Sequence, residues 1–160
     1  MMTTAALALL LVKTPVGLKP ADMVELRKTK QTIYLPTWLP AGFKGDVGVN
    51  VEKDPVMTGY SVEYSNGKGS SFVIQTASEG IGDIFLETKD GEQLEEMYVK
   101  VKTPYWGTQE LAIDKKTRRQ WVLNWQENKG KSLPTFVGLF GSNMALADVK
   151  RLIGSIQKFK

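Results

Sequence analysis

The sequence predicts an α+β fold. We expect a single curved antiparallel sheet of about seven strands, with a short N-terminal helix and a C-terminal amphipathic helix packed on it. Apolar and polar residues alternate through most of residues 45–141, which is the period-two pattern of half-buried strands. Helical patterns occur only near the ends, in residues 19–30 and 144–159. A chain of 160 residues is long enough to bury the core of one domain.

The composition is that of a folded protein and excludes several chemistries. Hydrophobic residues make up 42% of the chain and charged residues 24%, so wholesale disorder is not expected. The net charge of +4 is mild; it could assist contact with anionic lipid or nucleic acid, but a solvated surface explains it equally well. The chain contains neither histidine nor cysteine. This excludes Ser-His-Asp and thiol catalysis, zinc fingers, iron–sulfur clusters and disulfides.

The N-terminal segment, residues 1–18, is predicted to be distinct from a single domain at residues 19–160. Residues 5–12, AALALLLV, form an apolar run that has the length of a secretory core and is too short to span a bilayer. No Lys or Arg precedes this run. We interpret it as an export or anchor remnant that tethers the protein through residues 1–12 at an extracytoplasmic location. The alternative is a short strand or helix packed on the domain.

The first helix is expected within residues 19–30, where Pro20 can occupy the first turn and Met23, Val24 and Leu26 are the apolar positions. A stiff stretch follows. Pro36 and Pro40 cannot continue a helix and push the residues before them toward extended geometry. We interpret this stretch as a clamp at the entry to the sheet.

The strands follow at regular spacing, which is typical of an antiparallel meander. They are expected in residues 45–53, 58–65, 70–78, 83–93, 95–107, 108–128 (two strands around a charged turn) and 133–141. Residues 66–69, NGKG, tolerate positive φ and predict a hairpin turn. Asp90 and Gly91 predict another turn.

The last segment, residues 144–159, is expected to be helical throughout. Its apolar residues recur at steps of three and four, which gives one apolar face: Leu146, Val149, Leu152, Ile153 and Ile156. Ser142 or Asn143 can cap this helix. The apolar face needs a surface to cover, and one face of the sheet is the available partner.

Residues 34–44, YLPTWLPAGFK, resemble the entry motif of an uncharacterised bacterial and archaeal domain family. That motif is an aromatic or aliphatic residue, Leu-Pro, two residues, Leu-Pro, one residue, Gly and an aromatic. The resemblance covers roughly residues 22–157, with its second specific end at Ser155-Ile156. It implies a domain on the outer side of anti-sigma-like membrane proteins. The implied fold is similar to periplasmic lipoprotein carriers and to the sensor domain of the sigma-E regulator.

Aromatic residues supply the first candidate binding site. Trp121 and Trp125 project to one face of a strand, so they either pack in the core or line a hydrophobic groove on the concave face. Tyr60 and Tyr64 are further candidates for this groove. Three other residues could contribute, although strand parity does not place them all on that face: Phe72, Met97 and Tyr98.

A second candidate is the turn TPYWGT, residues 103–108, in which Tyr105 and Trp106 stand between Pro104 and Gly107. Adjacent side chains in a tight turn diverge. We therefore expect one ring to pack on the rim of the sheet and the other, that of Trp106, to be at least partly exposed. An exposed aromatic turn is typical of an interaction anchor.

Charged segments give no specific site. The basic turn at residues 114–120 is interpreted as a solvated turn, and no nucleic acid is expected as a partner. The acids of residues 89–96 lack the spacing of an EF-hand. We identify no catalytic, cofactor-binding or metal-binding residue and expect no cofactor.

The function expected from the sequence is a non-enzymatic extracytoplasmic binding or sensing domain that recognises a protein or lipid-like partner. An alternative is a carrier that holds a lipid or an acylated protein in a groove between sheet and helix. A third is an enzyme that uses carboxylate or lysine chemistry.

Overall fold

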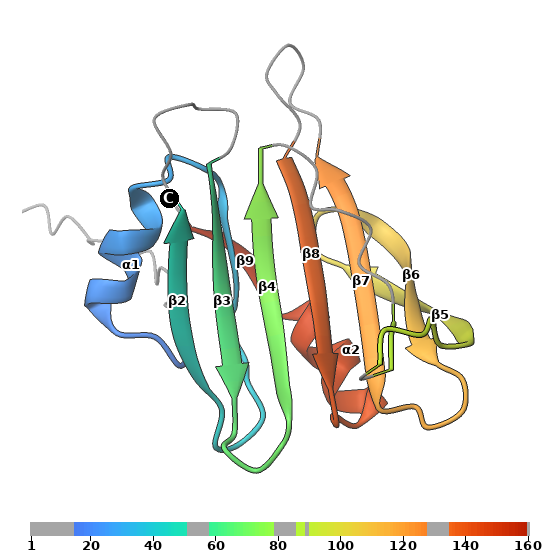
Figure 1. Cartoon of the computed structure of the whole chain (residues 1–160). Coiled ribbons are helices and arrows are strands. Elements are labelled where there is room, and N and C mark those ends of the chain that lie inside the picture. The colour runs from blue at the N-terminus through green and yellow to red at the C-terminus, as the bar shows by residue number, and fades with distance from the viewer. Residues whose placement is uncertain (1–14, 51–57, 79–85, 89, 128–134, 160) are drawn as a thin grey trace, which may run out of the picture.

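The computed structural model describes residues 15–50, 58–78, 86–88, 90–127 and 135–159, and Figure 1 shows their arrangement. Two helices and nine strands are named in this part of the chain: α1 (Pro20–Arg27), β1 (Ile33–Pro36), β2 (Lys44–Asn50), β3 (Gly59–Ser65), β4 (Ser71–Ala77), β5 (Glu96–Thr103), β6 (Gly107–Asp114), β7 (Gln120–Glu127), β8 (Thr135–Ser142), α2 (Leu146–Gly154) and β9 (Ile156–Phe159). Neither described helix is long and apolar enough to cross a membrane. The predicted tether at residues 1–12 lies outside the described residues.

The main sheet has seven antiparallel strands in the order β2-β3-β4-β8-β7-β6-β5. The predicted fold class is therefore confirmed. The order is not that of a simple meander, because β4 pairs with β8 and β5 lies at an edge. Strands that follow one another in the chain pair within two runs, β2-β3-β4 and β5-β6-β7-β8. The two runs meet where β4 pairs with β8. The sheet twists along its length, so β5 and β6 lie at an angle to β2–β4 (Figure 1).

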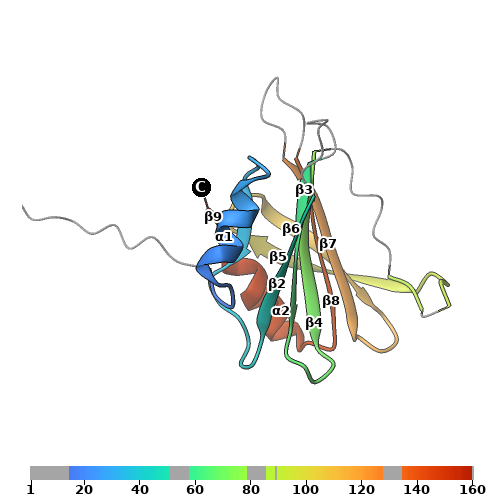
Figure 2. The same ribbon diagram turned by 60° about the vertical axis from the view of Figure 1, so that its left-hand side comes forward.

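A second layer covers one face of this sheet. Figure 2 shows α1, α2 and the small two-stranded sheet of β1 and β9 on the same side. The backbone N–H and the side-chain hydroxyl of Thr37 both donate to the oxygen of Ser155, at 3.1 and 2.8 Å. The stretch after β1 is thus bonded to the end of α2, which joins the N-terminal and C-terminal parts of the second layer.

The C-terminal helix is shorter than predicted. It ends at Gly154, and Ile156, which the three- and four-residue spacing assigned to the helix, lies in β9 opposite Pro36. The N-cap is Ala145, and its side chain makes no cap hydrogen bond, so the predicted caps Ser142 and Asn143 are wrong. The backbone of Asn143 has φ 55°, which turns the chain from β8 into α2.

The core lies between the two layers, and tyrosine side chains connect them. Tyr60 is 3% exposed, and its hydroxyl accepts a hydrogen bond from the backbone N–H of Tyr34 in β1 at 2.6 Å. Tyr64 stacks on Phe72 with ring centroids 4.7 Å apart. Burial raises the pKa values of Tyr60 and Tyr64 far above the usual range, so both hydroxyls stay protonated.

The predicted entry clamp around Pro36 and Pro40 belongs to the same layer as β1 and α2. Pro36 ends β1, and Phe43 is buried in the core. The ring of Trp38 lies under the guanidinium of Arg151 in α2, with 4.2 Å from Cζ to the ring centroid. The stretch therefore packs against the core and against α2, as the prolines predicted.

The other face of the sheet is covered over a smaller area. Leu86 packs there with Ala112 and Val122 in a separate buried cluster. The strand predicted at residues 83–93 is wrong in its described part, where an isolated bridge between Glu87 and Gln93 replaces it.

Candidate functional site

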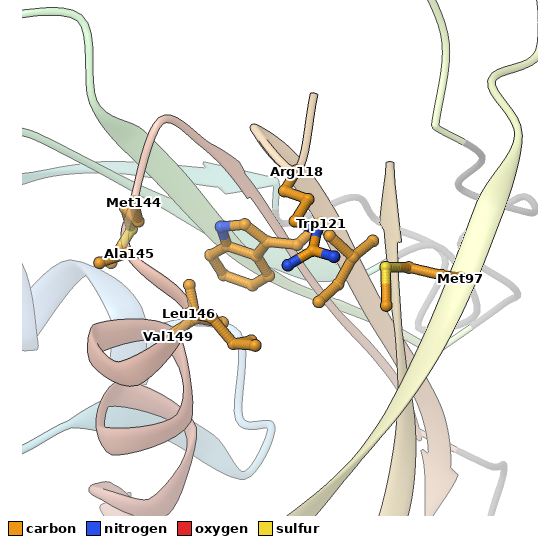
Figure 3. Close-up of a pocket in the computed structure, with 8 residues that line it drawn as sticks. Met97, Arg118, Trp121, Met144, Ala145, Leu146 and Val149 are labelled. Carbon is orange, nitrogen blue, oxygen red and sulfur yellow. The ribbon is translucent and has the colours of Figure 1, made fainter. Parts of the chain in front are cut away.

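An apolar pocket of about 260 Å³ opens between the sheet and the N-terminal end of α2 (Figure 3). The lining side chains come from β5, β6, β7, the β6–β7 turn, the β8–α2 connection and α2: Met97, Ile113, Arg118, Trp121, Met144, Ala145, Leu146 and Val149. Seven of these eight residues are apolar. Pockets that hold small ligands have this composition, with a few polar groups that orient the ligand.

The pocket exists because the first turn of α2 extends past the part of the helix that packs on the sheet. Val149 is buried at 1% exposure, whereas Leu146, one turn earlier, is 39% exposed. Both residues lie on the apolar stripe of the helix, so the stripe continues past the part that the sheet covers. The exposed end of the stripe forms one wall of the pocket.

Trp121 forms the opposite wall, and a glycine in the next strand gives its ring space. Trp121 in β7 pairs with Gly141 in β8. A Cβ atom on Gly141 would lie 2.6 Å from Cζ2 of Trp121 and 2.6 Å from the backbone oxygen of Ser71. A larger residue in β8 would therefore displace the indole from the pocket wall. Trp121 itself is 2% exposed.

A basic basin of about 490 Å³ adjoins the apolar pocket. Its lining residues are Lys68, Gly69, Arg118, Arg119, Asn143 and Met144. Arg118 and Met144 line both hollows, so the two meet at these residues. Among the described residues, no acidic side chain lines either hollow.

Asn143 holds together the three turns that form the basin. Its side-chain Nδ2 donates to the backbone oxygen of Gly69 at 2.8 Å, and its backbone N–H donates to the oxygen of Arg119 at 2.7 Å. Its backbone oxygen accepts from the hydroxyl of Ser70 at 2.8 Å. The β3–β4 turn, the β6–β7 turn and the start of α2 are thereby fixed at one end of the sheet.

The β6–β7 turn is also ordered from within. The carboxylate of Asp114 accepts hydrogen bonds from the hydroxyl of Thr117 and from the backbone N–H groups of Lys116 (3.0 Å) and Thr117 (3.3 Å). The hydrogen bond from the Thr117 hydroxyl lowers the pKa of the Asp114 carboxyl, whereas burial raises it. The hydrogen bond has the larger effect, so the pKa lies below its usual value. Arg118 follows with φ 57°, a left-handed conformation that is uncommon for a residue other than glycine.

The aromatic residues that the sequence analysis assigned to one groove lie in different parts of the structure. Tyr60, Tyr64 and Trp125 are core residues at 3%, 0% and 8% exposure. Of the six residues named as candidate binding residues, only Trp121 lines the pocket. Of the three residues named as possible contributors, Met97 lines the pocket, Phe72 is in the core and Tyr98 is an exposed residue.

In the predicted aromatic turn Trp106 is partly exposed, as expected, but Tyr105 is the more exposed of the two rings. Tyr105 is 40% exposed, and its hydroxyl contacts the side chain of Gln157 and the backbone N–H of Lys158. Trp106 is only partly exposed and packs against the core. Its ring centroid lies 4.0 Å from that of Trp125 and 5.1 Å from that of Tyr34. The turn is a structural contact with β1 and β9 more than a free anchor.

Sequence reasoning missed six of the eight lining residues as parts of a site: Ile113, Arg118, Met144, Ala145, Leu146 and Val149. Leu146 was assigned to the apolar stripe, but the sequence does not show that the sheet ends short of it. Arg118 was part of a turn interpreted as solvated. The sequence pattern does not indicate that this turn lies next to the turn that contains Lys68.

Within the described parts of the chain, no group of three or more acidic side chains is placed to hold a metal ion. Comparison of the chain with protein families, curated proteins and solved structures finds no match. The resemblance of the residue 34–44 motif to a domain family therefore stays a prediction. The candidate site has to be interpreted from its own geometry.

Proposed function

We propose that this protein is a non-enzymatic binding domain that holds the apolar chain of a lipid-like ligand between its sheet and α2. The observation that carries the proposal is the pocket of about 260 Å³ with a lining that is apolar except for Arg118. Of the functions expected from the sequence, the lipid-like partner and the carrier fit this pocket best. An extracytoplasmic setting rests on the apolar run at residues 5–12 and is proposed with it.

The size of the pocket limits the ligand to a short chain. At about 30 Å³ for each water-sized group, the pocket has room for about nine such groups. This is the size of 1-octanol. Burial of apolar surface supplies the affinity. At roughly 0.5 kcal/mol per non-hydrogen atom, the expected Kd is about 1 mM.

The test is an NMR titration of the protein with 1-octanol, followed through backbone amide signals and the four tryptophan indole N–H signals. We expect saturable shifts at Trp121, Met97 and Met144. Ala145→Phe, which places a ring at the pocket wall, should weaken binding about tenfold. Ala147→Phe is the matched control, because Ala147 is exposed on the same helix and does not line the pocket. A titration of the wild-type protein without saturable shifts at the pocket would contradict the proposal.

A further inference from the structure

The junction between the apolar pocket and the basic basin indicates what kind of head group the ligand has. A chain in the pocket leads to Arg118 and Met144, and beyond them lie Lys68 and Arg119. An amphiphile whose chain fills the pocket therefore places its head group among three cations. This step rests on the proposed function, because it takes the pocket as the site of the apolar chain.

The two arginines are available for an anion. In the described residues, neither Arg118 nor Arg119 forms an ion pair, and the two ion pairs found there join Lys28 to Glu25 and Lys115 to Glu95. The described lining residues of the pocket and the basin include no carboxylate, so a bound anion meets no like charge from them. Arginine is well suited to phosphate and carboxylate because its planar donors match their oxygens.

A buried hydrogen-bond donor faces the same junction. Trp121 is 2% exposed, and its Nε1 is one of five buried side-chain polar atoms that have no hydrogen-bond partner in the described structure. It is the one of the five whose residue lines the pocket. Figure 3 shows this nitrogen on the side of the ring that faces Met144, one of the two residues shared by the hollows. Buried donors are rarely left unpaired, because their lost hydration is then not replaced. An acceptor oxygen of a ligand at the junction would replace it.

The start of α2 adds to the positive potential. Ala145 is both the N-cap and a lining residue, and its side chain makes no cap hydrogen bond. The backbone N–H groups of a first helical turn favour an anion. Asp148 in this turn lines neither hollow.

We infer that the occupant is a single-chain amphiphile with a phosphate head group, whose chain fills the apolar pocket and whose phosphate lies at the junction with the basic basin. A phosphate is preferred to a carboxylate because it offers three acceptor oxygens and nearly two charges to the guanidinium groups, Lys68 and the Trp121 indole.

The test compares three ligands with the same chain: octyl phosphate, octanoate and 1-octanol. The Kd of each is measured by NMR titration of the wild-type protein at low salt. We expect octyl phosphate to bind at least about tenfold more tightly than 1-octanol, with octanoate between them. The Trp121 indole signal should move to a new position with octyl phosphate. Raising the salt from about 0.05 to about 0.5 M should weaken binding of the phosphate and leave 1-octanol unchanged.

Arg118→Gly removes the guanidinium and keeps the turn. Because Arg118 has φ 57°, glycine fits this backbone without strain, and the melting temperature should be kept or raised. The Kd of octyl phosphate should rise about tenfold and that of 1-octanol less than about threefold. Lys30→Gly is the matched control, since Lys30 has φ 56° and lines neither hollow. This variant should bind all three ligands as the wild type does.

The outcomes separate the two proposals. If none of the three ligands binds at the pocket, the proposed function fails, and this inference fails with it. If 1-octanol binds as tightly as octyl phosphate, the pocket stands and the anionic head group is wrong. Equal Kd values for octanoate and octyl phosphate would overturn the preference for phosphate. Equal weakening of octyl phosphate and 1-octanol by Arg118→Gly would overturn the assignment of the head group to Arg118.

Discussion

Trp106 and Tyr105 are neighbours in one turn, yet their environments differ. Trp106 packs against Trp125 in β7 and Tyr34 in β1, so its ring connects the turn to both layers. Tyr105 contacts the rings of Trp106 and Tyr34 edge-on, with centroids 5.5 and 6.4 Å apart, and also reaches β9 through its hydroxyl. The two rings do not diverge as the sequence predicted, since they contact each other edge-on. The larger ring takes the more buried side because it removes more apolar surface from water.

Two single substitutions measure this difference. Trp106→Ala should lower the free energy of unfolding by about 3 kcal/mol, because it leaves a cavity between Trp125 and Tyr34. Tyr105→Ala should cost about 1 kcal/mol through its lost hydrogen bonds. Urea denaturation of the two variants and the wild type gives both values. Losses that agree within about 0.5 kcal/mol would contradict the assignment of Trp106 as the packed ring.

The β6–β7 turn is an element whose stability depends on one carboxylate. The hydrogen bonds of Asp114 favour its charged form, so the pKa of the folded state lies below that of the unfolded chain. The stabilisation is therefore complete above the ordinary pKa of about 3.9 and is lost as the pH falls through the lower folded pKa. The same turn presents Arg118 to the pocket, so acid is expected to loosen the candidate site as well.

Asp114→Ala tests this dependence. At pH 7 the variant should be less stable than the wild type by about 1.5–3 kcal/mol, the range for hydrogen bonds to a charged group. The difference should stay constant down to about pH 5 and shrink below about pH 4. Thr117→Val keeps the side-chain shape, removes the hydroxyl donor and should show part of the same loss. Denaturation midpoints across this range give the result, and a difference that is as large at pH 3 as at pH 7 would refute it.

The sequence predicts elements better than it predicts their pairing. Alternation placed Trp121, Leu123 and Trp125 on one face of β7, and all three are buried. The hairpin at residues 66–69 joins β3 and β4 as expected. Both predictions depend on residues close together in the chain, where local sterics and burial decide the geometry.

Pairing between strands that are far apart in the chain could not be predicted from local sequence patterns. Ile156 fits a helical spacing from Ile153, and nothing nearby in the sequence shows that β1 needs a partner strand. The four residues of β9 bond to β1, far back along the chain, and this pairing outweighs continuation of the helix. The meeting of β4 with β8, and of Lys68 with Arg118, depends on the same long-range arrangement. A groove between sheet and helix was predicted, but the basic basin beside it was missed for this reason.

At the scale of the whole molecule, one core joins both layers. The main buried cluster includes residues of α1, β1, the sheet, α2 and β9, among them Leu26, Leu35, Ile74, Leu152 and Phe159. Neither layer buries its apolar face without the other. The hydrogen bonds of Thr37 to Ser155 also connect the entry clamp to the end of α2. Such a molecule is expected to lose all its layers together.

We therefore expect unfolding in one cooperative step. Far-UV circular dichroism reports the helices and strands of both layers. Tryptophan fluorescence reports Trp121 and Trp125 in β7, Trp106 in the β5–β6 turn and Trp38 beside α2. The two urea curves should coincide, because a domain with a single shared core unfolds in an all-or-none transition. The helical signal would disappear at lower urea than the fluorescence change if α2 were only loosely attached to the sheet. In that case the pocket between α2 and Trp121 would open before the sheet unfolds.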